Sequence, residues 1–128
     1  MTRLLFVALG GAIGASARYG LGQAALRLAP GVAWPWGTFV ANVLGGLVMG
    51  LLVGWLALKG GVEQEAIRLF AAVGVLGGFT TFSAFSLEAV QMIERRQWVL
   101  AGGYVALSVV LSIAALFVGL AIARRGFS

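Results

Sequence analysis

Residues 77–86 read GGFTTFSAFS, in the middle of an apolar run, residues 66–93, that carries only two charged side chains. Two adjacent glycines weaken a helix, because each costs about 1 kcal/mol relative to alanine in a helix interior. The hydroxyls of Thr80, Thr81 and Ser83 can cap a helix that starts again after an interruption. The stretch predicts a membrane-spanning helix that is broken near the bilayer centre. The alternative is a continuous helix whose hydroxyls bond back to the preceding turn.

A break at this depth predicts an ion-binding region. It leaves carbonyl oxygens free at the end of the first half-helix and N–H groups free at the start of the second. Free carbonyls attract a cation, and a helix N-terminus attracts an anion. Irregular backbone persists at membrane depth only where protein buries it or an aqueous path runs beside it.

The composition of the whole chain agrees with a membrane protein. Of the 128 residues, 61% are hydrophobic and 10% are charged, whereas soluble chains carry about 25% charged residues. The predicted fold class is an all-α membrane protein, a single transmembrane domain over residues 1–128. Its four transmembrane helices are expected at residues 4–28, 38–58, 66–93 and 98–123, each long enough to cross a bilayer. The first run also resembles a cleaved signal peptide, but its helical pattern continues past residue 17, which favours a retained span.

Basic residues are almost balanced between the two sides of the membrane. With four spans, one side holds Arg3, Lys59, Arg68, Arg124 and Arg125, and the other holds Arg27, Arg95 and Arg96, plus Arg18 if it leans that way. Orientation needs a clear difference in Lys and Arg between the sides. The balance predicts insertion in both orientations, and hence an antiparallel homodimer. The alternative is that so few loop charges carry no information.

Small residues at a spacing of four mark the packing faces of the helices. They let helix backbones approach closely in lipid. The sets are Gly10 and Gly14; Gly46, Gly50 and Gly54; and Ala115, Gly119 and Ala123. They predict that the spans associate, within one chain or between two.

Uncharged polar and aromatic residues within the spans are candidate ion ligands. Phe79, Phe82 and Phe85 are spaced by three, roughly on one helix face, and indicate either packing or edge-on contact of the electropositive ring edges with a small anion. The Asn42 side chain offers two donors, for an ion or for a neighbouring helix. Tyr104, Ser108 and Ser112 repeat at every fourth position. Three aligned hydroxyls are typical of the wall of a narrow wet path.

Two charged residues lie more than one turn from the ends of the spans, and other site chemistries are excluded. Arg18 and Glu88 are functional candidates, although both have the alternative of snorkelling or pairing near an interface. The chain has no Cys and no His, so disulfides and the usual transition-metal sites are excluded. Without an acidic pair in the spans, no enzyme site is expected. The basic residues are scattered, so no nucleic-acid partner is expected.

A family resemblance extends over essentially the whole length and rests on three motifs together with the repeated hydroxyls of Tyr104, Ser108 and Ser112. The motifs are GxxGAxxRY at residues 11–19, WPWGTFxxNxxGG at residues 34–46 and GxxGGFTTFSxFSxE at residues 74–88. The chain resembles the small fluoride channels of the Fluc or CrcB family. The resemblance implies an antiparallel homodimer of four-helix subunits in the cell inner membrane or plasma membrane, with two fluoride pathways. Fluoride that has entered the cytoplasm as the neutral acid would leave passively through them.

The resemblance also implies roles for individual residues. A structural sodium ion at the dimer centre is expected on the backbone carbonyls of Gly77 and Thr80. The fluoride pathway is expected along Asn42, Phe82, Phe85, Tyr104, Ser108 and Ser112. An adjoining polar track is expected at Thr38, Ser83 and Glu88, with Arg18 in the vestibule. The family pattern TTFSTF is TTFSAF here, so Ala84 removes one hydroxyl from the polar track.

Two other functions remain as alternatives. A small dual-topology drug exporter also has four spans, but it needs a membrane-embedded carboxylate, and the first span contains no Asp or Glu. A membrane assembly subunit would use its glycine faces to dock larger partners and would pass no ions by itself.

Overall fold

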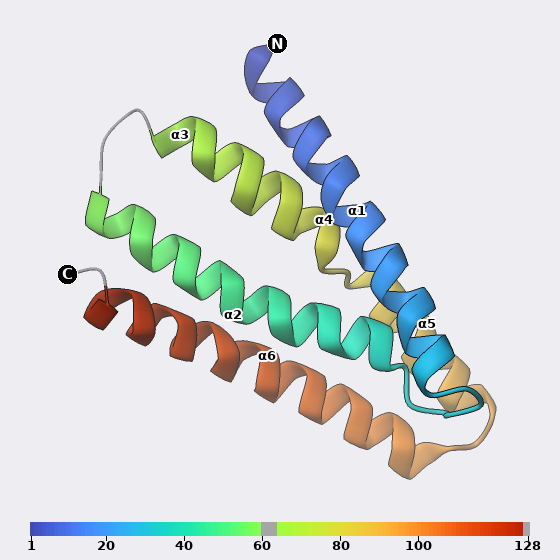
Figure 1. The fold of residues 1–128 in the computed structure, drawn as a ribbon. Coiled ribbons are helices and arrows are strands. Elements are labelled where there is room, and N and C mark those ends of the chain that lie inside the picture. The colour runs from blue at the N-terminus through green and yellow to red at the C-terminus, as the bar shows by residue number, and fades with distance from the viewer. Residues whose placement is uncertain (60–63, 127–128) are drawn as a thin grey trace.

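The structure, a computed structural model, describes residues 1–59 and 64–126. Within these residues, four segments are long and apolar enough to cross a membrane. They are α1 (Thr2–Leu28), α2 (Trp36–Lys59), the segment Gln64–Glu94 and α6 (Trp98–Gly126) (Figure 1). The N-terminus and the C-terminal end of α6 lie toward one end of the molecule, and the two short connections lie toward the other (Figure 1). The predicted all-α fold with four membrane-length helices is confirmed.

The third segment is wound in four pieces. These are α3 (Gln64–Ile67), η1 (Arg68–Leu76), α4 (Gly77–Phe79) and α5 (Ser83–Glu94). The second piece, η1, is a π-helix, and the N–H of Gly77 donates to the carbonyl of Ala72, five residues earlier. π-Helices are rare and usually span a single turn, often at functional sites. Nothing in the sequence pattern predicted this winding.

The predicted interruption of the third segment is confirmed, about midway along it. Thr80 is extended, with φ −86° and ψ 155°, and regular α-helix resumes at Ser83. The glycine pair that suggested the break remains helical. Gly78 instead permits close packing, because a Cβ there would lie 2.6 Å from the carbonyl oxygen of Gly11 on α1.

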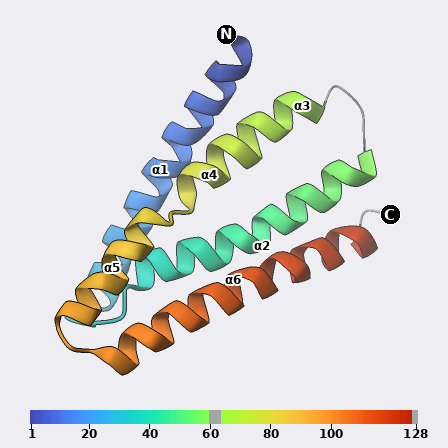
Figure 2. The same ribbon diagram turned by 180° about the vertical axis from the view of Figure 1, so that it is seen from behind.

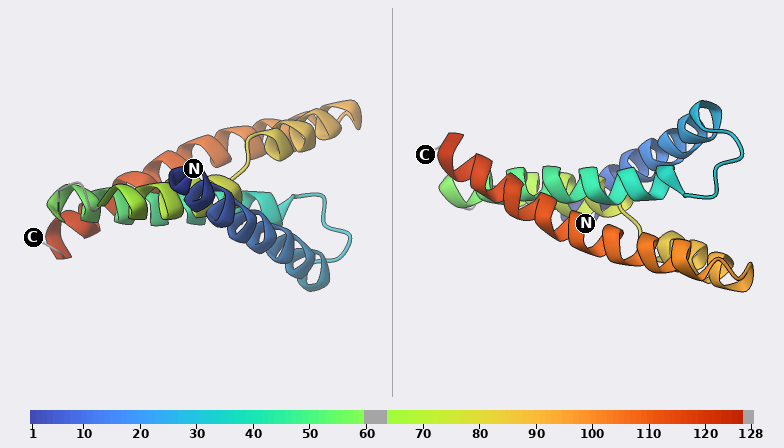
Figure 3. Two further views of the ribbon diagram at one scale, coloured as in Figure 1. Left: turned by 90° about the horizontal axis from the view of Figure 1, so that it is seen from above. Right: turned by 90° about the horizontal axis from the view of Figure 1, so that it is seen from below.

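The break lets the two halves of the third segment pack on different helices. The first half, η1 and α4, packs against α1, whereas α5 packs against α6. Figure 2 shows the extended stretch that joins α4 to α5. Figure 3 shows the consequence: α1 and the α5–α6 pair diverge toward the end that holds the short connections. A continuous helix would follow only one of these directions.

Glycines bring the remaining helices into backbone contact. On α2, a Cβ at Gly46 would lie 2.7 Å from the carbonyl oxygen of Ser112, and one at Gly50 would overlap the carbonyl of Leu116. On α6, a Cβ at Gly119 would lie 3.0 Å from the Cα of Gly50. The small-residue faces on α2 and α6 therefore associate within the chain, as close helix packing in lipid requires.

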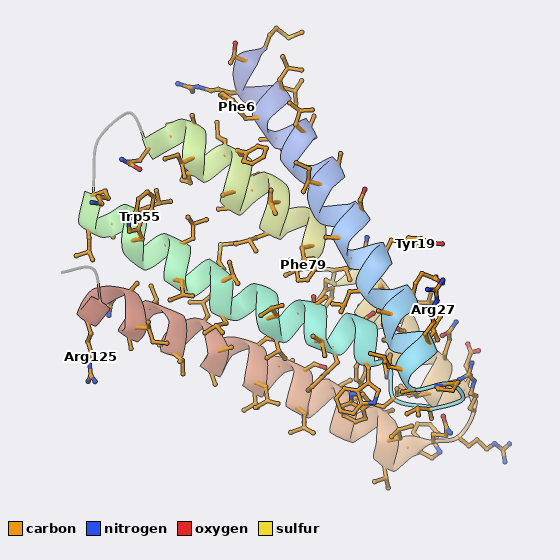
Figure 4. All side chains as sticks on the ribbon, viewed as in Figure 1. Phe6, Tyr19, Arg27, Trp55, Phe79 and Arg125 are labelled. Carbon is orange, nitrogen blue, oxygen red and sulfur yellow. The ribbon has the colours of Figure 1, made fainter. Side chains whose placement is uncertain are left out.

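The outer surface is apolar, as expected for helices that face lipid. Large hydrophobic side chains such as Val99 and Phe117 are mostly exposed. Trp55 lies near the C-terminal end of α2 (Figure 4), where an aromatic belt places tryptophans. The buried core is small, and its cluster is Phe85, Ala89, Met92, Ala101 and Tyr104.

Candidate functional site

A cavity of about 430 Å³ lies between α2, the break, α5 and α6. We name it the serine cavity. Five predicted pathway residues line it, together with Thr80: Asn42, Phe82, Phe85, Ser108 and Ser112. These residues come from three separate membrane-length segments. The fold therefore brings together side chains that lie between positions 42 and 112 of the sequence.

The two serines supply buried hydroxyls to this cavity. Their spacing of four places both on the same face of α6. Ser108 is 5% exposed, and neither Ser108 nor Ser112 has a hydrogen-bond partner for its Oγ among the described residues. An intramembrane serine usually bonds to its own backbone. Two donors are therefore left for a species inside the cavity.

Two of the three phenylalanines belong to the cavity. The ring centroids of Phe82 and Phe85 lie 5.6 Å apart, with planes inclined at 50°. Phe79 ends α4, before the extended residue, and does not line the serine cavity. It lies on the side of α4 near α1 and α2 (Figure 4). The expectation of one shared helix face for all three rings is wrong, because the helix is interrupted between Phe79 and Phe82.

The side chain of Asn42 bonds to the backbone of the break. Its Nδ2 donates to the carbonyl of Thr81 at 3.0 Å, and its Oδ1 accepts from the N–H of Thr81 at 2.8 Å. One N–H of the amide remains, since Nδ2 carries two. Asn42 therefore serves the third segment as well as the cavity that it lines.

A threonine hydroxyl bonds to the backbone at each end of the break. Thr80 donates its hydroxyl to the carbonyl of Leu76 at 2.9 Å, closing the first half. The hydroxyl of Thr81 accepts from the N–H of Ala84 at 3.2 Å and so caps the first turn of α5. The predicted capping of a restarting helix is confirmed for Thr81. Ser83 lies 3.3 Å from the Thr81 hydroxyl and lines neither described cavity.

A second cavity, of about 380 Å³, lies between α1, the first connection, α2 and α5. We name it the arginine cavity. Arg18, Thr38 and Glu88 line it, with Arg95 at the same end of the molecule. The Nε of Arg18 donates to the carbonyl of Gly78 at 3.3 Å. The predicted vestibule residue and two of the three predicted polar-track residues therefore share one space.

Tyr104 lies between the two cavities. It is fully buried, and its ring centroid lies 5.2 Å from that of Phe85 in the serine cavity. Its hydroxyl donates to Oε1 of Glu88, which lines the arginine cavity, at 3.2 Å. Trp34 holds the ring edge-on, with centroids 5.3 Å apart and planes at 88°.

Two contributors to the site were missed. Trp34 packs on Tyr104, a contact that its place near the end of a span, where an aromatic belt is expected, does not predict. Gly45 was assigned no role, yet a Cβ there would collide with Cγ2 of Thr80. Its position one turn after Asn42 is the signal that was available, because residues three and four apart share a helix face.

Comparison with known proteins identifies the family. The model of the family described as "CrcB-like protein, Camphor Resistance (CrcB)" matches residues 5–120. The chain belongs to the CrcB family. It is 60% identical over 128 residues to a protein of Caulobacter sp. (strain K31), covering 100% of this chain and 99% of that protein. It is 58% identical over 129 residues to a protein of Hyphomonas neptunium, covering 100% of each. Both CrcB relatives are named "Fluoride-specific ion channel FluC".

Family membership and the four spans agree. This CrcB-family chain is a multi-pass membrane protein with a bent third helix. The comparisons give no support to a drug exporter or an assembly subunit.

Proposed function

We propose that this chain is a fluoride-specific ion channel that lets fluoride leave the cell passively. The names of relatives that are 50–60% identical over nearly the whole chain support this function. The observation that carries it is the serine cavity: two serines whose buried hydroxyls have no partner among the described residues line it together with Asn42 and two aromatic rings. Among the residues that the structure describes, no Lys or Arg lines that cavity.

The donors of the serine cavity suit a small, strongly hydrated anion. Such an ion crosses the membrane only if protein groups replace its water. Hydroxyl and amide hydrogens do so directly, and the electropositive edges of Phe82 and Phe85 add to them. Neutral donors at several positions bind weakly enough for the ion to leave again. A cavity lined by fixed positive charge would retain the ion.

The arginine cavity supports the role of a vestibule. Arg18 and Arg95 line it together with Glu88. A positive potential at the mouth of a pore concentrates anions and raises their rate of arrival. Tyr104 lines neither cavity, but it contacts Phe85 of the serine cavity and Glu88 of the arginine cavity. An ion that moves from one cavity to the other would therefore pass its side chain.

We further propose that the working unit is an antiparallel homodimer with two such pathways. Phe82 is 76% exposed, and it lies beside backbone that breaks at membrane depth, which needs cover from protein or water. A second copy across the break would supply that cover.

The same unit would hold a sodium ion on the carbonyls of Gly77 and Thr80. Among the described residues, the N–H of Thr81 donates to Asn42 and not to the carbonyl of Gly77, so that carbonyl lacks its helical donor. Carbonyl oxygens are ligands that suit a hard cation. When bound, the ion would supply positive charge between two conduits that carry little of their own.

Fluoride efflux from liposomes tests the function. Purified protein should release fluoride from loaded vesicles, as read by a fluoride electrode, while chloride stays inside. Protein-free vesicles give the background leak. If the protein passes no fluoride, or passes chloride equally well, the proposal is wrong. A lack of all flux would favour the assembly subunit.

A further inference from the structure

We infer that Asn42 is a positioning residue that holds the third segment open, in addition to facing the anion in the serine cavity. The inference rests on the proposed function only for its consequence in transport. Its structural content concerns how a side chain of α2 sets the backbone of the break.

The first step is the pair of bonds between Asn42 and one peptide backbone. The amide oxygen and nitrogen of Asn42 bond to the N–H and the carbonyl of Thr81 at 2.8 and 3.0 Å. An amide is suited to this, since it offers a donor and an acceptor side by side. A carboxylate would have no donor for the Thr81 carbonyl.

The second step is competition with the helix. In an uninterrupted α-helix, the N–H of Thr81 would donate to the carbonyl of Gly77, four residues earlier. Asn42 takes that N–H, and Thr80 is extended immediately before it. The helix therefore ends where α2 offers a better-placed acceptor, and the carbonyl of Gly77 is left free for a cation.

The third step is the fit of α2 around the break. Gly45, three residues after Asn42, gives room to Cγ2 of Thr80, which any Cβ at that position would meet. The hydroxyl of Thr80 turns back onto Leu76. Asn42 and Gly45 together therefore accommodate the extended conformation of Thr80 against α2.

The consequence is a link between the anion and the cation. The remaining N–H of the Asn42 amide is available to the serine cavity, and the other groups of the same amide keep the Gly77 carbonyl free. Loss of Asn42 therefore removes an anion donor and also closes the break.

Amide hydrogen exchange, measured by NMR on the full chain in fluoride-free detergent solution, tests the bond in the unmodified protein. Thr81 N–H has Asn42 as its acceptor, whereas Phe82 N–H has no acceptor among the described residues. We expect Thr81 to exchange roughly tenfold or more slowly than Phe82, as a retained hydrogen bond requires. Equal rates would overturn the inference without any variant.

Two matched variants extend the test. In Asn42→Ala, either Thr81 exchanges roughly tenfold faster, or the Cα shift of Thr80 changes from an extended to a helical value. Ser112→Ala alters the same cavity without touching Thr81, so both signals should stay as in the parent protein. If Asn42→Ala leaves both the exchange rate and the shift unchanged, Asn42 is only a cavity donor.

Transport is scored separately. Both variants should slow fluoride efflux, but only Asn42→Ala should alter the break. If the parent protein passes no fluoride, the proposed function fails while the exchange data still decide the role of Asn42.

Discussion

Ser108 and Ser112 lower the stability of the fold, because their buried hydroxyls find no hydrogen-bond partner in the part of the chain that the structure describes. A buried hydroxyl without a partner costs about 1–3 kcal/mol, and both Oγ atoms are in that state among the described residues. Valine or alanine would fill the same helix face without this cost. The cost is accounted for if the hydroxyls donate to a transported ion.

The exchange of these serines for alanine separates transport from stability. Ser108→Ala or Ser112→Ala should slow fluoride efflux at low fluoride by roughly tenfold or more, since a hydrogen bond to a charged group contributes about 1.5–3 kcal/mol. Thermal stability in detergent should stay equal or rise slightly, because an unsatisfied buried group is removed. Electrode recordings and thermal unfolding measure the two quantities.

Ser16 provides the matched control for both serine variants. It lies exposed on α1, away from the residues that line the serine cavity. Ser16→Ala should leave efflux unchanged. Loss of efflux in Ser16→Ala, or full efflux in both cavity variants, would contradict the role of the α6 hydroxyls.

The phenylalanines give a second contrast between residues. Phe82→Ile and Phe85→Ile should each slow fluoride efflux by roughly tenfold or more, because isoleucine keeps the bulk but has no electropositive ring edge. Phe79→Ile should have little effect, since Phe79 lies outside the serine cavity. The same efflux assay compares all three. Equal behaviour of the three variants would mean that the rings only pack.

The gathering of the site residues could be predicted, but their bonds could not. Asn42, Ser108 and Ser112 stood out as polar groups in apolar runs, and the structure gathers them in one cavity. The pairing of Asn42 with Thr81 joins residues 39 positions apart, and it depends on which face of α2 meets the break. Periodicity in a sequence carries no information about that pairing.

At the scale of the element, the third segment shows why the sequence predicts that a helix is broken but not at which residue the break lies. Gly77 and Gly78 lower helix stability, yet the helix continues through them because α1 packs directly on Gly78. The chain leaves the helix at Thr80, where groups of α2 compete for its backbone. The π-helical winding of η1 has no counterpart in the sequence pattern either, because such windings are rare and usually span a single turn.

The contact between α1 and the third segment predicts a sensitive glycine. In Gly14→Ala the new Cβ would lie 2.8 Å from the nitrogen of Phe79 and 2.9 Å from the carbonyl carbon of Val75. Overpacking of this kind costs about 1–3 kcal/mol. We expect a lower unfolding temperature in detergent and a loss of efflux, because α4 leads directly into the break.

Gly20 is the control on the same helix. A Cβ there meets nothing within 4 Å, so Gly20→Ala should be neutral or stabilising by up to about 1 kcal/mol. If Gly14→Ala unfolds at the same temperature as Gly20→Ala, the close approach of α1 to the third segment does not hold in the membrane protein.

At the scale of the whole molecule, the distribution of charge bears on how the chain inserts. Arg27 and Arg125 lie at opposite ends (Figure 4). Arg18 bonds through Nε to the carbonyl of Gly78 at the break, and we count it with Arg95 because the two line one cavity. The nine basic residues then divide five against four. A difference of one basic residue between the two sides is too small to set the orientation by the positive-inside rule.

The near balance predicts that single molecules insert both ways, and the chain is well suited to a direct test. It contains no cysteine, so a thiol introduced by Val32→Cys, at a half-exposed site in the first connection, is the only one present. An impermeant thiol reagent added outside intact cells should label roughly half of the molecules, as expected without an orientation bias.

Arg95→Gln combined with Arg96→Asn should raise that fraction toward complete labelling, because the connections lose two of their four charges and are then exported. Asn suits the second site, since Arg96 has φ 61° and asparagine tolerates that conformation. Complete labelling or complete protection of the parent chain would mean one orientation, and an antiparallel pair could not form.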